Sequence, residues 1–346
     1  MNAATASFVI QAVRPDSLLE ESTVLACPEF CNEYEAWVEA LSYAERLQAQ
    51  LLFLLALDRA PWKKDIPARA RTFLWSRLQA ECALMESLDQ ELISCLDLFG
   101  RAKLPIGLLK GMDISRRFYP ERILRPVGEI KLLAPPGSSL DALRVLGKGG
   151  YRLVGGSFPD NSQVLLTKQG RTSVIALHAR LFQQDSEELM AELWHRSEGN
   201  VIAGLPIHAQ ALHPEDCLVY LIRHCALHTL SSPVWLNDIH FLIEKMKKRE
   251  MDWDQITWSL AQARSLSAAW LIFSLLRAEW GTEVPADIPA RLGKKIGLIR
   301  RRMLIKLSRP QAWFPIEKQT LPRLMRSKYL LRDGALNGLK AALSRD

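Results

Sequence analysis

Residues 129–134 read EIKLLA, a short apolar run that carries charged residues at its first and third positions. Gly128 before the run and Pro135 after it mark turns, so the run has the length and the boundaries of a buried β-strand. Side chains along a strand alternate between its two faces, which places Glu129 and Lys131 on the same face. The stretch therefore predicts a strand that presents one acid and one cation side by side.

Other short apolar runs surround this strand between about residues 103 and 184. Turns containing glycine or proline separate them, and a helix fits between Ser138 and Leu146. The runs are Ile106–Leu109, Tyr151–Val154, Gln163–Thr167 and Val174–Leu177. This order of strands and helices predicts a small α/β sheet with helices to one side.

The segments on both sides of this sheet have a helical pattern. Apolar residues recur at spacings of three and four from about Glu33 to Gly100 and again after Ser186, and a basic helix is expected between Arg291 and Leu307. We therefore predict an α+β protein in three parts. They are a helical region at 1–100, an α/β core at 101–185, and a helical region with a basic tail at 186–346.

Composition indicates an ordinary globular protein, with 48% apolar and 24% charged residues among 346. The first 13 residues carry no Lys or Arg and no long apolar block, so we expect no signal peptide and a cytoplasmic location. No apolar run approaches the roughly 20 residues that a transmembrane helix needs. The net charge of +7 favours anionic partners, but much of the excess lies in the last sixty residues.

Further motifs occur in a fixed order around EIKLLA. Residues 108–113 read LLKGMD, 118–120 read FYP, 125–128 read RPVG and 174–178 read VIALH. Together they resemble the family of uncharacterised bacterial nucleotidyltransferases, which shows a Leu-Lys-Gly turn, a Tyr-Pro, an Arg and a strand of pattern Asp-Ile-Asp-Leu-Leu-Val. The resemblance implies a nucleotidyltransferase-like core, a small mixed sheet flanked by N- and C-terminal helical regions.

The chain departs from that pattern at the positions that would hold metal ions. The family has aspartates where this sequence has Glu129 and Lys131, and its third acid corresponds to Ala176. Nucleotidyl transfer in this fold uses two divalent cations held by carboxylates. Because an ammonium repels a nearby cation, we expect Mg²⁺ binding to be impaired and Lys131 to pair with Glu129 or with an anion.

The resemblance also suggests a basic pocket at the site of the former metal centre. Lys110, Gly111 and Arg125 are the predicted cofactor-binding residues, and Lys110, Arg125 and Lys131 would hold the phosphates of a nucleoside triphosphate such as ATP without metal. The alternative is that Lys110 and Arg125 are solvated or paired with Glu129.

Three residues are the catalytic candidates that line this site: Glu129, Lys131 and His178. His178 follows the strand that contains Ala176 and is either a proton carrier or, as we favour, a packed and hydrogen-bonded histidine. If metal binds, Glu129 and Asp113 are the predicted ligands, with Asp160 as another helper. Asp113 has an alternative role at the start of a helix.

The expected function is therefore binding of a nucleotide, an anionic metabolite or a protein partner rather than efficient catalysis. One alternative is an active Mg²⁺-dependent enzyme that transfers a nucleoside monophosphate from a nucleoside triphosphate to a small molecule or peptide. Another is a non-catalytic subunit of a biosynthetic or regulatory complex. Nucleic acid is not a favoured partner.

Two remaining patterns have an ordinary and a functional interpretation. His224 and His228 share a helix face near Asp238, which suits either zinc or, as we favour, a structural His–Asp role. Residues 294–307 mix basic and apolar side chains. We favour a solvated helix there, with contact to a macromolecular anion or partner, or to a membrane, as the alternatives.

Overall fold

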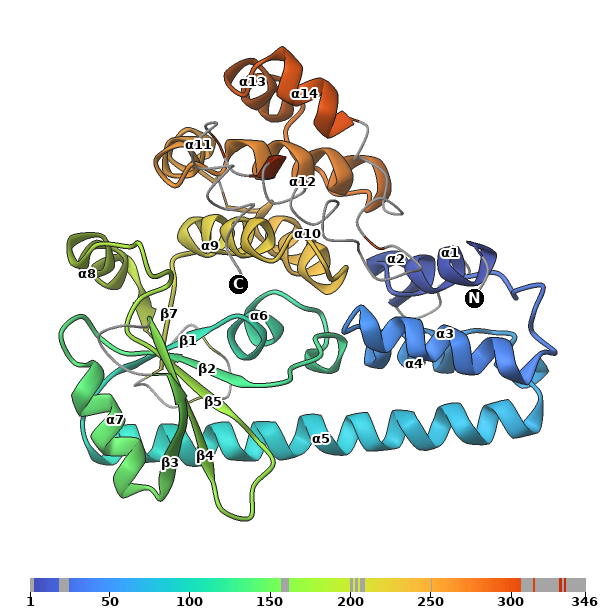
Figure 1. Cartoon of the computed structure of the whole chain (residues 1–346), viewed down its shortest axis with the longest axis horizontal. Helices are drawn as coiled ribbons and strands as arrows, with labels where there is room; N and C mark the ends of the chain where they lie inside the picture. The colour runs from blue at the N-terminus through green and yellow to red at the C-terminus, as the bar shows by residue number, and fades with distance from the viewer. Residues whose placement is uncertain are drawn as a thin grey trace. The chain divides into compact units, whose positions relative to one another are not determined.

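The computed structural model of the chain describes residues 3–18, 25–156, 162–199, 202, 205, 209–249, 251–305, 314, 330, 331 and 333. It contains two compact units (Figure 1). Unit 1 comprises Met1–Leu78 and Leu218–Asp346, and unit 2 comprises Gln79–Cys217. The boundaries fall within two helices, α5 (Ala68–Arg101) and α9 (Pro214–Leu227). The predicted division into three regions follows element type rather than packing, and it stays a prediction.

Unit 2 is built on one mixed sheet, which in the described residues has seven strands in the order β3-β4-β5-β2-β1-β7-β6. The central strand β2 pairs antiparallel with β1 and parallel with β5, and β1 pairs parallel with β7. The strands are β1 (Ile106–Leu109), β2 (Ile130–Leu133), β3 (Tyr151–Gly156), β4 (Gln163–Lys168), β5 (Ile175–His178), β6 (Glu198–Gly199) and β7 (Ala209–Ala211). The α+β class predicted from the sequence is confirmed.

One face of the sheet supplies the core of unit 2. Strand register places on this face the buried side chains Leu108, Ile130, Leu132, Val164, Leu166, Ile175, Leu177 and, on β3, Tyr151. Helix α5 packs against this face, since the Tyr151 hydroxyl donates a hydrogen bond to the buried Glu91 carboxylate of α5 (Figure 1). The opposite face carries Leu109, Lys131, Ala176 and His178.

Short helices complete unit 2. They are α6 (Gly111–Arg117), η2 (Arg122–Leu124), α7 (Ser139–Lys148) and α8 (Glu187–Arg196). The hydroxyl of Ser186 caps α8 by accepting a hydrogen bond of 3.2 Å from the Leu189 backbone N–H. Helix α7 agrees closely with the predicted helix at Ser138 to Leu146.

All the regular secondary structure in the described residues of unit 1 is helical. Its helices are α1 (Ala3–Ala12), α2 (Pro15–Leu18), α3 (Tyr34–Arg46), α4 (Gln50–Arg59), η1 (Lys63–Asp65), α10 (Val234–Met246), α11 (Trp253–Gln262), α12 (Leu266–Glu279), α13 (Asp287–Lys295) and α14 (Leu298–Ile305), with parts of α5 and α9. The buried Asn237 side chain ties distant segments together, because it donates to the Val13 carbonyl at 2.8 Å and accepts from the Trp280 indole at 2.7 Å. In the described ranges no helix combines the length and apolarity needed to cross a bilayer.

The structure corrects the sequence prediction in two places. The single basic helix expected between Arg291 and Leu307 is wrong in the described residues, because Gly297 adopts a φ of 80° and separates α13 from α14. Its last residues lie outside the described ranges. The sequence pattern also does not predict β6 and β7, since runs of two or three residues give no visible alternation.

Candidate functional site

The turn between β1 and α6 places Lys110 and Gly111 at the edge of the sheet. Lys110 has a φ of 53° and a ψ of −130°, an uncommon conformation for a residue with a side chain. Such a conformation costs on the order of 1–3 kcal/mol and persists only where the surrounding packing enforces it. The conformation of the Leu-Lys-Gly turn is therefore imposed by its neighbours.

Gly111 lets the Arg125 side chain lie against this turn. A Cβ atom at position 111 would lie 2.8 Å from Cγ2 of Val127 and 3.3 Å from Nη1 of Arg125. Arg125 is buried, and its Nη1 donates to the Pro126 carbonyl. The structure thus brings together two of the predicted cofactor-binding residues, and the absence of a side chain at position 111 makes their contact possible.

A methyl group at position 111 is expected to disturb this packing. We predict that Gly111→Ala lowers the free energy of unfolding by about 1–3 kcal/mol, because Val127 and Arg125 must both move. Gly147→Ala in α7 is the matched control, since a Cβ there meets nothing within 4 Å and alanine favours a helix. Urea unfolding of both variants measures the difference, and equal effects would contradict the steric role of Gly111.

Glu129 and Lys131 form an ion pair at the start of β2. Nζ of Lys131 lies 2.6 Å from Oε1 of Glu129, with the lysine side chain 13% exposed and the glutamate side chain 39% exposed. The predicted pairing of these two residues is confirmed. The Lys131 ammonium therefore neutralises Glu129, which is the one acidic residue of the segment EIKLLA.

Strand register places Ala176 directly beside Lys131. Lys131 is opposite Ala176 on β5 and opposite Leu109 on β1, so the three side chains form one row across the sheet face. A methyl group and an isobutyl group thus flank the ammonium. Neither neighbour can ligate a metal ion.

His178 lies further along the same face and is buried, 6% exposed. The pKa of its imidazole is lowered to about 3, mainly because the ring is buried and also because Lys131 and Lys110 are positively charged. Neither ring nitrogen has a hydrogen-bond partner among the described residues, although the backbone of Arg180 lies nearby. The expectation of a packed histidine is confirmed, and the expectation that it is hydrogen-bonded stays a prediction.

His178 should make the protein sensitive to acid. The unfolded chain takes up this proton near pH 6.5 and the folded chain only near pH 3, so acid favours the unfolded state between these values. The stabilisation is complete above pH 6.5 and is lost as the pH falls toward 3. We predict that, between pH 6 and 4, the wild type loses up to about 1.4 kcal/mol per pH unit more than His178→Phe in denaturant unfolding. Parallel pH profiles of the two proteins would contradict this assignment.

Asp113 is committed to a buried ion pair. Its two carboxylate oxygens lie 2.5 Å from Nε and 2.6 Å from Nη2 of Arg117, one helical turn on in α6, and both side chains are almost fully buried. Burial lowers the pKa of Arg117, but the adjacent carboxylate outweighs it and raises that pKa above its ordinary value. Arg117 was not singled out from the sequence, although Asp and Arg four residues apart on a helix are a recognisable pair.

The residues at this site do not fit a pair of divalent cations. Glu129 is neutralised by Lys131, Ala176 has no ligand atom, and both oxygens of Asp113 contact Arg117. Across the described part of the chain no group of three His, Cys, Asp or Glu side chains is arranged to hold a metal. Asp160, the other predicted helper, lies outside the described residues.

His224 near the end of α9 and His228 just after it belong to unit 1 and pack against an aromatic ring. The ring centroids of His224 and His228 are 4.3 Å apart, and that of His224 is 4.7 Å from that of Trp235. His224 and Asp238 are both buried. This packing supports the structural role for these residues over a zinc site.

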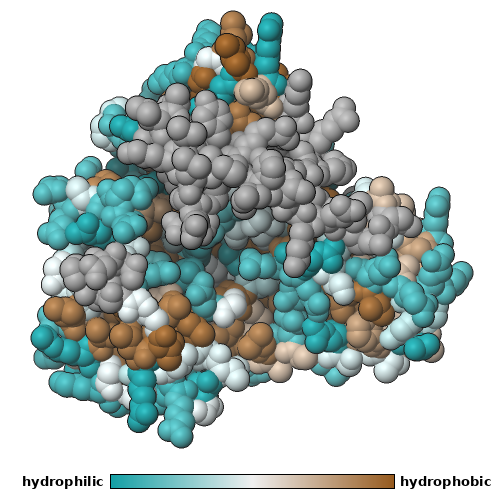
Figure 2. All heavy atoms as spheres, viewed as in Figure 1, coloured by the Kyte–Doolittle hydropathy of each residue, from teal (hydrophilic) through white to brown (hydrophobic). Residues whose placement is uncertain are grey.

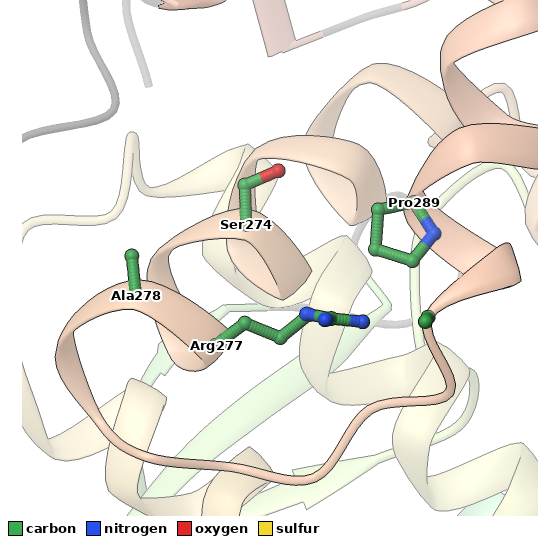
Figure 3. A pocket seen from close by; sticks show the side chains of 5 residues that line it. Ser274, Arg277, Ala278 and Pro289 are labelled. Carbon is green, nitrogen blue, oxygen red and sulfur yellow. The ribbon is translucent and has the colours of Figure 1, made fainter.

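A shallow depression of about 390 Å³ lies on unit 1, between α12 and the start of α13 (Figure 3). Ser274, Arg277, Ala278, Ala286 and Pro289 line it. Arg277 is the one charged side chain in this lining, and its Nη1 donates to the Val284 carbonyl at 3.0 Å. Because the lining offers no second titratable group, we place the functional site on the sheet of unit 2.

Comparison with protein families gives a match that covers most of the chain. A family model described as an uncharacterised nucleotidyltransferase matches residues 33–281, which includes the whole of unit 2. Comparison with curated proteins gives no match.

Proposed function

The chain belongs to the uncharacterised nucleotidyltransferase family, and from this we propose that it binds a nucleotide or a related phosphate-bearing anion without efficient nucleotidyl transfer. The observation that carries the proposal is the Lys131–Glu129 ion pair beside Ala176. The family pattern has carboxylates at all three positions. Here one acid is paired with a cation and the third position carries a methyl group.

The positive charges on this sheet face suit an anion. Lys110 and Lys131 come from different elements, yet both act electrostatically on the His178 imidazole. Glu129 offsets part of the Lys131 charge, and the two lysines together still favour an anion over a cation at this face. Arg125 is held against the same turn by Gly111 and adds a third cation.

Neutral His178 extends the polar character of the face without adding charge. At neutral pH the ring has one N–H donor and one acceptor nitrogen, and because both nitrogens are buried a ligand would meet them only by displacing the packing around the ring. A phosphate oxygen suits the donor, whereas a metal ion would have to approach past two ammonium groups. We place this binding in the cytoplasm, where nucleoside triphosphates are available.

Calorimetric titration with ATP, GTP, CTP and UTP at low salt, with and without Mg²⁺, tests the proposal. We predict metal-independent binding that Lys131→Met weakens by about tenfold or more, because a charged hydrogen-bonding group is lost. Lys148→Met, at an exposed position in α7, is the matched control and should leave the affinity unchanged.

Each other outcome selects a different function. Binding that requires Mg²⁺, together with release of pyrophosphate, would replace the proposal with an active nucleotidyltransferase. No binding of any triphosphate or of inorganic phosphate would leave a non-catalytic subunit that recognises a protein partner.

A further inference from the structure

Helix α14 exposes large aliphatic side chains to solvent. Leu298 is 71% exposed, Ile299 78%, Met303 47% and Ile305 49%. At 3.6 residues per turn these four side chains project over one broad arc of roughly 160°, and Leu304, which is buried, points to the opposite side. Leu304 thus anchors the helix to unit 1, and the aliphatic arc, Leu298, Ile299, Met303 and Ile305, faces away from that anchor.

Positive charge accompanies the aliphatic arc. From Ile288 to Ile316 the sequence contains eight Lys or Arg residues and no Asp or Glu. Arg302 lies within the aliphatic arc, and Arg301, Lys294 and Lys295 are exposed close by in sequence. Figure 2 shows brown and teal residues intermixed over α13 and α14, at the top of the view.

We propose that the aliphatic arc of α14 binds the surface of an anionic membrane, with the four aliphatic side chains among the acyl chains and the surrounding cations at the lipid phosphates. Burial of the aliphatic groups and attraction to anionic headgroups act together at such a surface. Arginine in the arc is tolerated there, because its long stem lets the guanidinium reach the headgroups while the neighbouring side chains insert.

A lipid surface suits these residues better than nucleic acid does. Phosphate backbones are held by Lys, Arg and polar side chains and leave exposed aliphatic groups in water. The four side chains of the aliphatic arc are all aliphatic and lie together on one helix, which a bilayer interface can bury at once. Binding to nucleic acid or to an acidic protein is therefore an alternative result of the experiment below.

Sedimentation of the full chain with lipid vesicles tests the proposal. We expect binding to vesicles of phosphatidylcholine with phosphatidylserine, weak or no binding to phosphatidylcholine alone, and loss of binding as salt increases. Leu298→Ser/Ile299→Ser should lower the partition coefficient at least about tenfold. Arg301→Gln/Arg302→Gln should lower it roughly 30-fold on anionic vesicles alone.

Leu140→Ser/Val154→Ser is the matched control. These side chains are 56% and 60% exposed and lie in unit 2, so the same chemical change is made away from α14. Three results would overturn the proposal: no sedimentation with anionic vesicles, an equal effect of the control, or binding to single-stranded RNA that the apolar double variant does not change. Because all six substituted positions are exposed, each variant is expected to keep the wild-type melting temperature.

Discussion

The double variant Lys131→Asp/Ala176→Asp is expected to bind Mg²⁺ at least about a hundredfold more tightly than the wild type. Strand register places the two positions directly opposite each other on β2 and β5. Glu129, released from its ion pair, lies two residues before the first of them. Three carboxylates would then share one face of the sheet, which is the kind of oxygen cluster that Mg²⁺ binds.

The size of the expected increase in Mg²⁺ affinity follows from the change in local charge. Lys131→Asp changes the local charge by two units and Ala176→Asp by one. One unit of charge at 4 Å changes the energy of a monovalent ion by about 4 kcal/mol at an effective dielectric of 20. A hundredfold change in affinity needs about 2.8 kcal/mol, so it lies well within this range.

Calorimetry with MgCl₂ measures the change in Mg²⁺ affinity, and two controls test whether one added carboxylate or a change in net charge is sufficient to cause it. Ala176→Asp alone should not bind Mg²⁺, because its carboxylate would pair with the remaining Lys131 ammonium. Lys148→Asp changes the net charge by two units, as Lys131→Asp does, at an exposed position outside the site. A folded double variant without Mg²⁺ affinity would show that this sheet face cannot hold Mg²⁺ even with three carboxylates, and it would remove the support that the missing carboxylates give to the proposed function.

The sheet could be predicted from the sequence because its strands are short apolar runs between clear breakers. The alternation of EIKLLA was enough to place Glu129 and Lys131 on one face, and the ion pair at 2.6 Å follows from that placement. The pairing of Lys131 with Ala176 could be suggested only by the family pattern. A single strand does not specify its partner's register, which depends on contacts across the whole sheet.

Other features of the site depend on packing that no local pattern encodes. The positive φ of Lys110 and the close approach of Arg125 to Gly111 arise where η2 and the chain before β2 fold back on the turn. Which polar groups reach the ring nitrogens of His178 depends on how the neighbouring segments pack, and sequence spacing contains no such information. The break at Gly297 was visible as a glycine, but a glycine inside an amphipathic run does not by itself reveal its φ.

Replacing Arg117 by methionine is expected to destabilise the protein by about 3–5 kcal/mol. The Arg117 and Asp113 side chains are 5% and 1% exposed, so removing the guanidinium leaves a carboxylate buried without its partner. Many small domains have a total stability of about 5–15 kcal/mol, so unit 2 should become marginal. Urea unfolding followed by tryptophan fluorescence measures the loss.

Arg144→Met is the matched control, because Arg144 also pairs with an aspartate on a helix, at 2.7 Å, but both side chains are more than half exposed. It should cost at most about 1 kcal/mol. Adding Asp113→Asn to Arg117→Met removes the stranded charge and should recover more than half of the loss. If instead the double variant is as unstable as Arg117→Met, the arginine acts through the packing of its stem rather than through its charge.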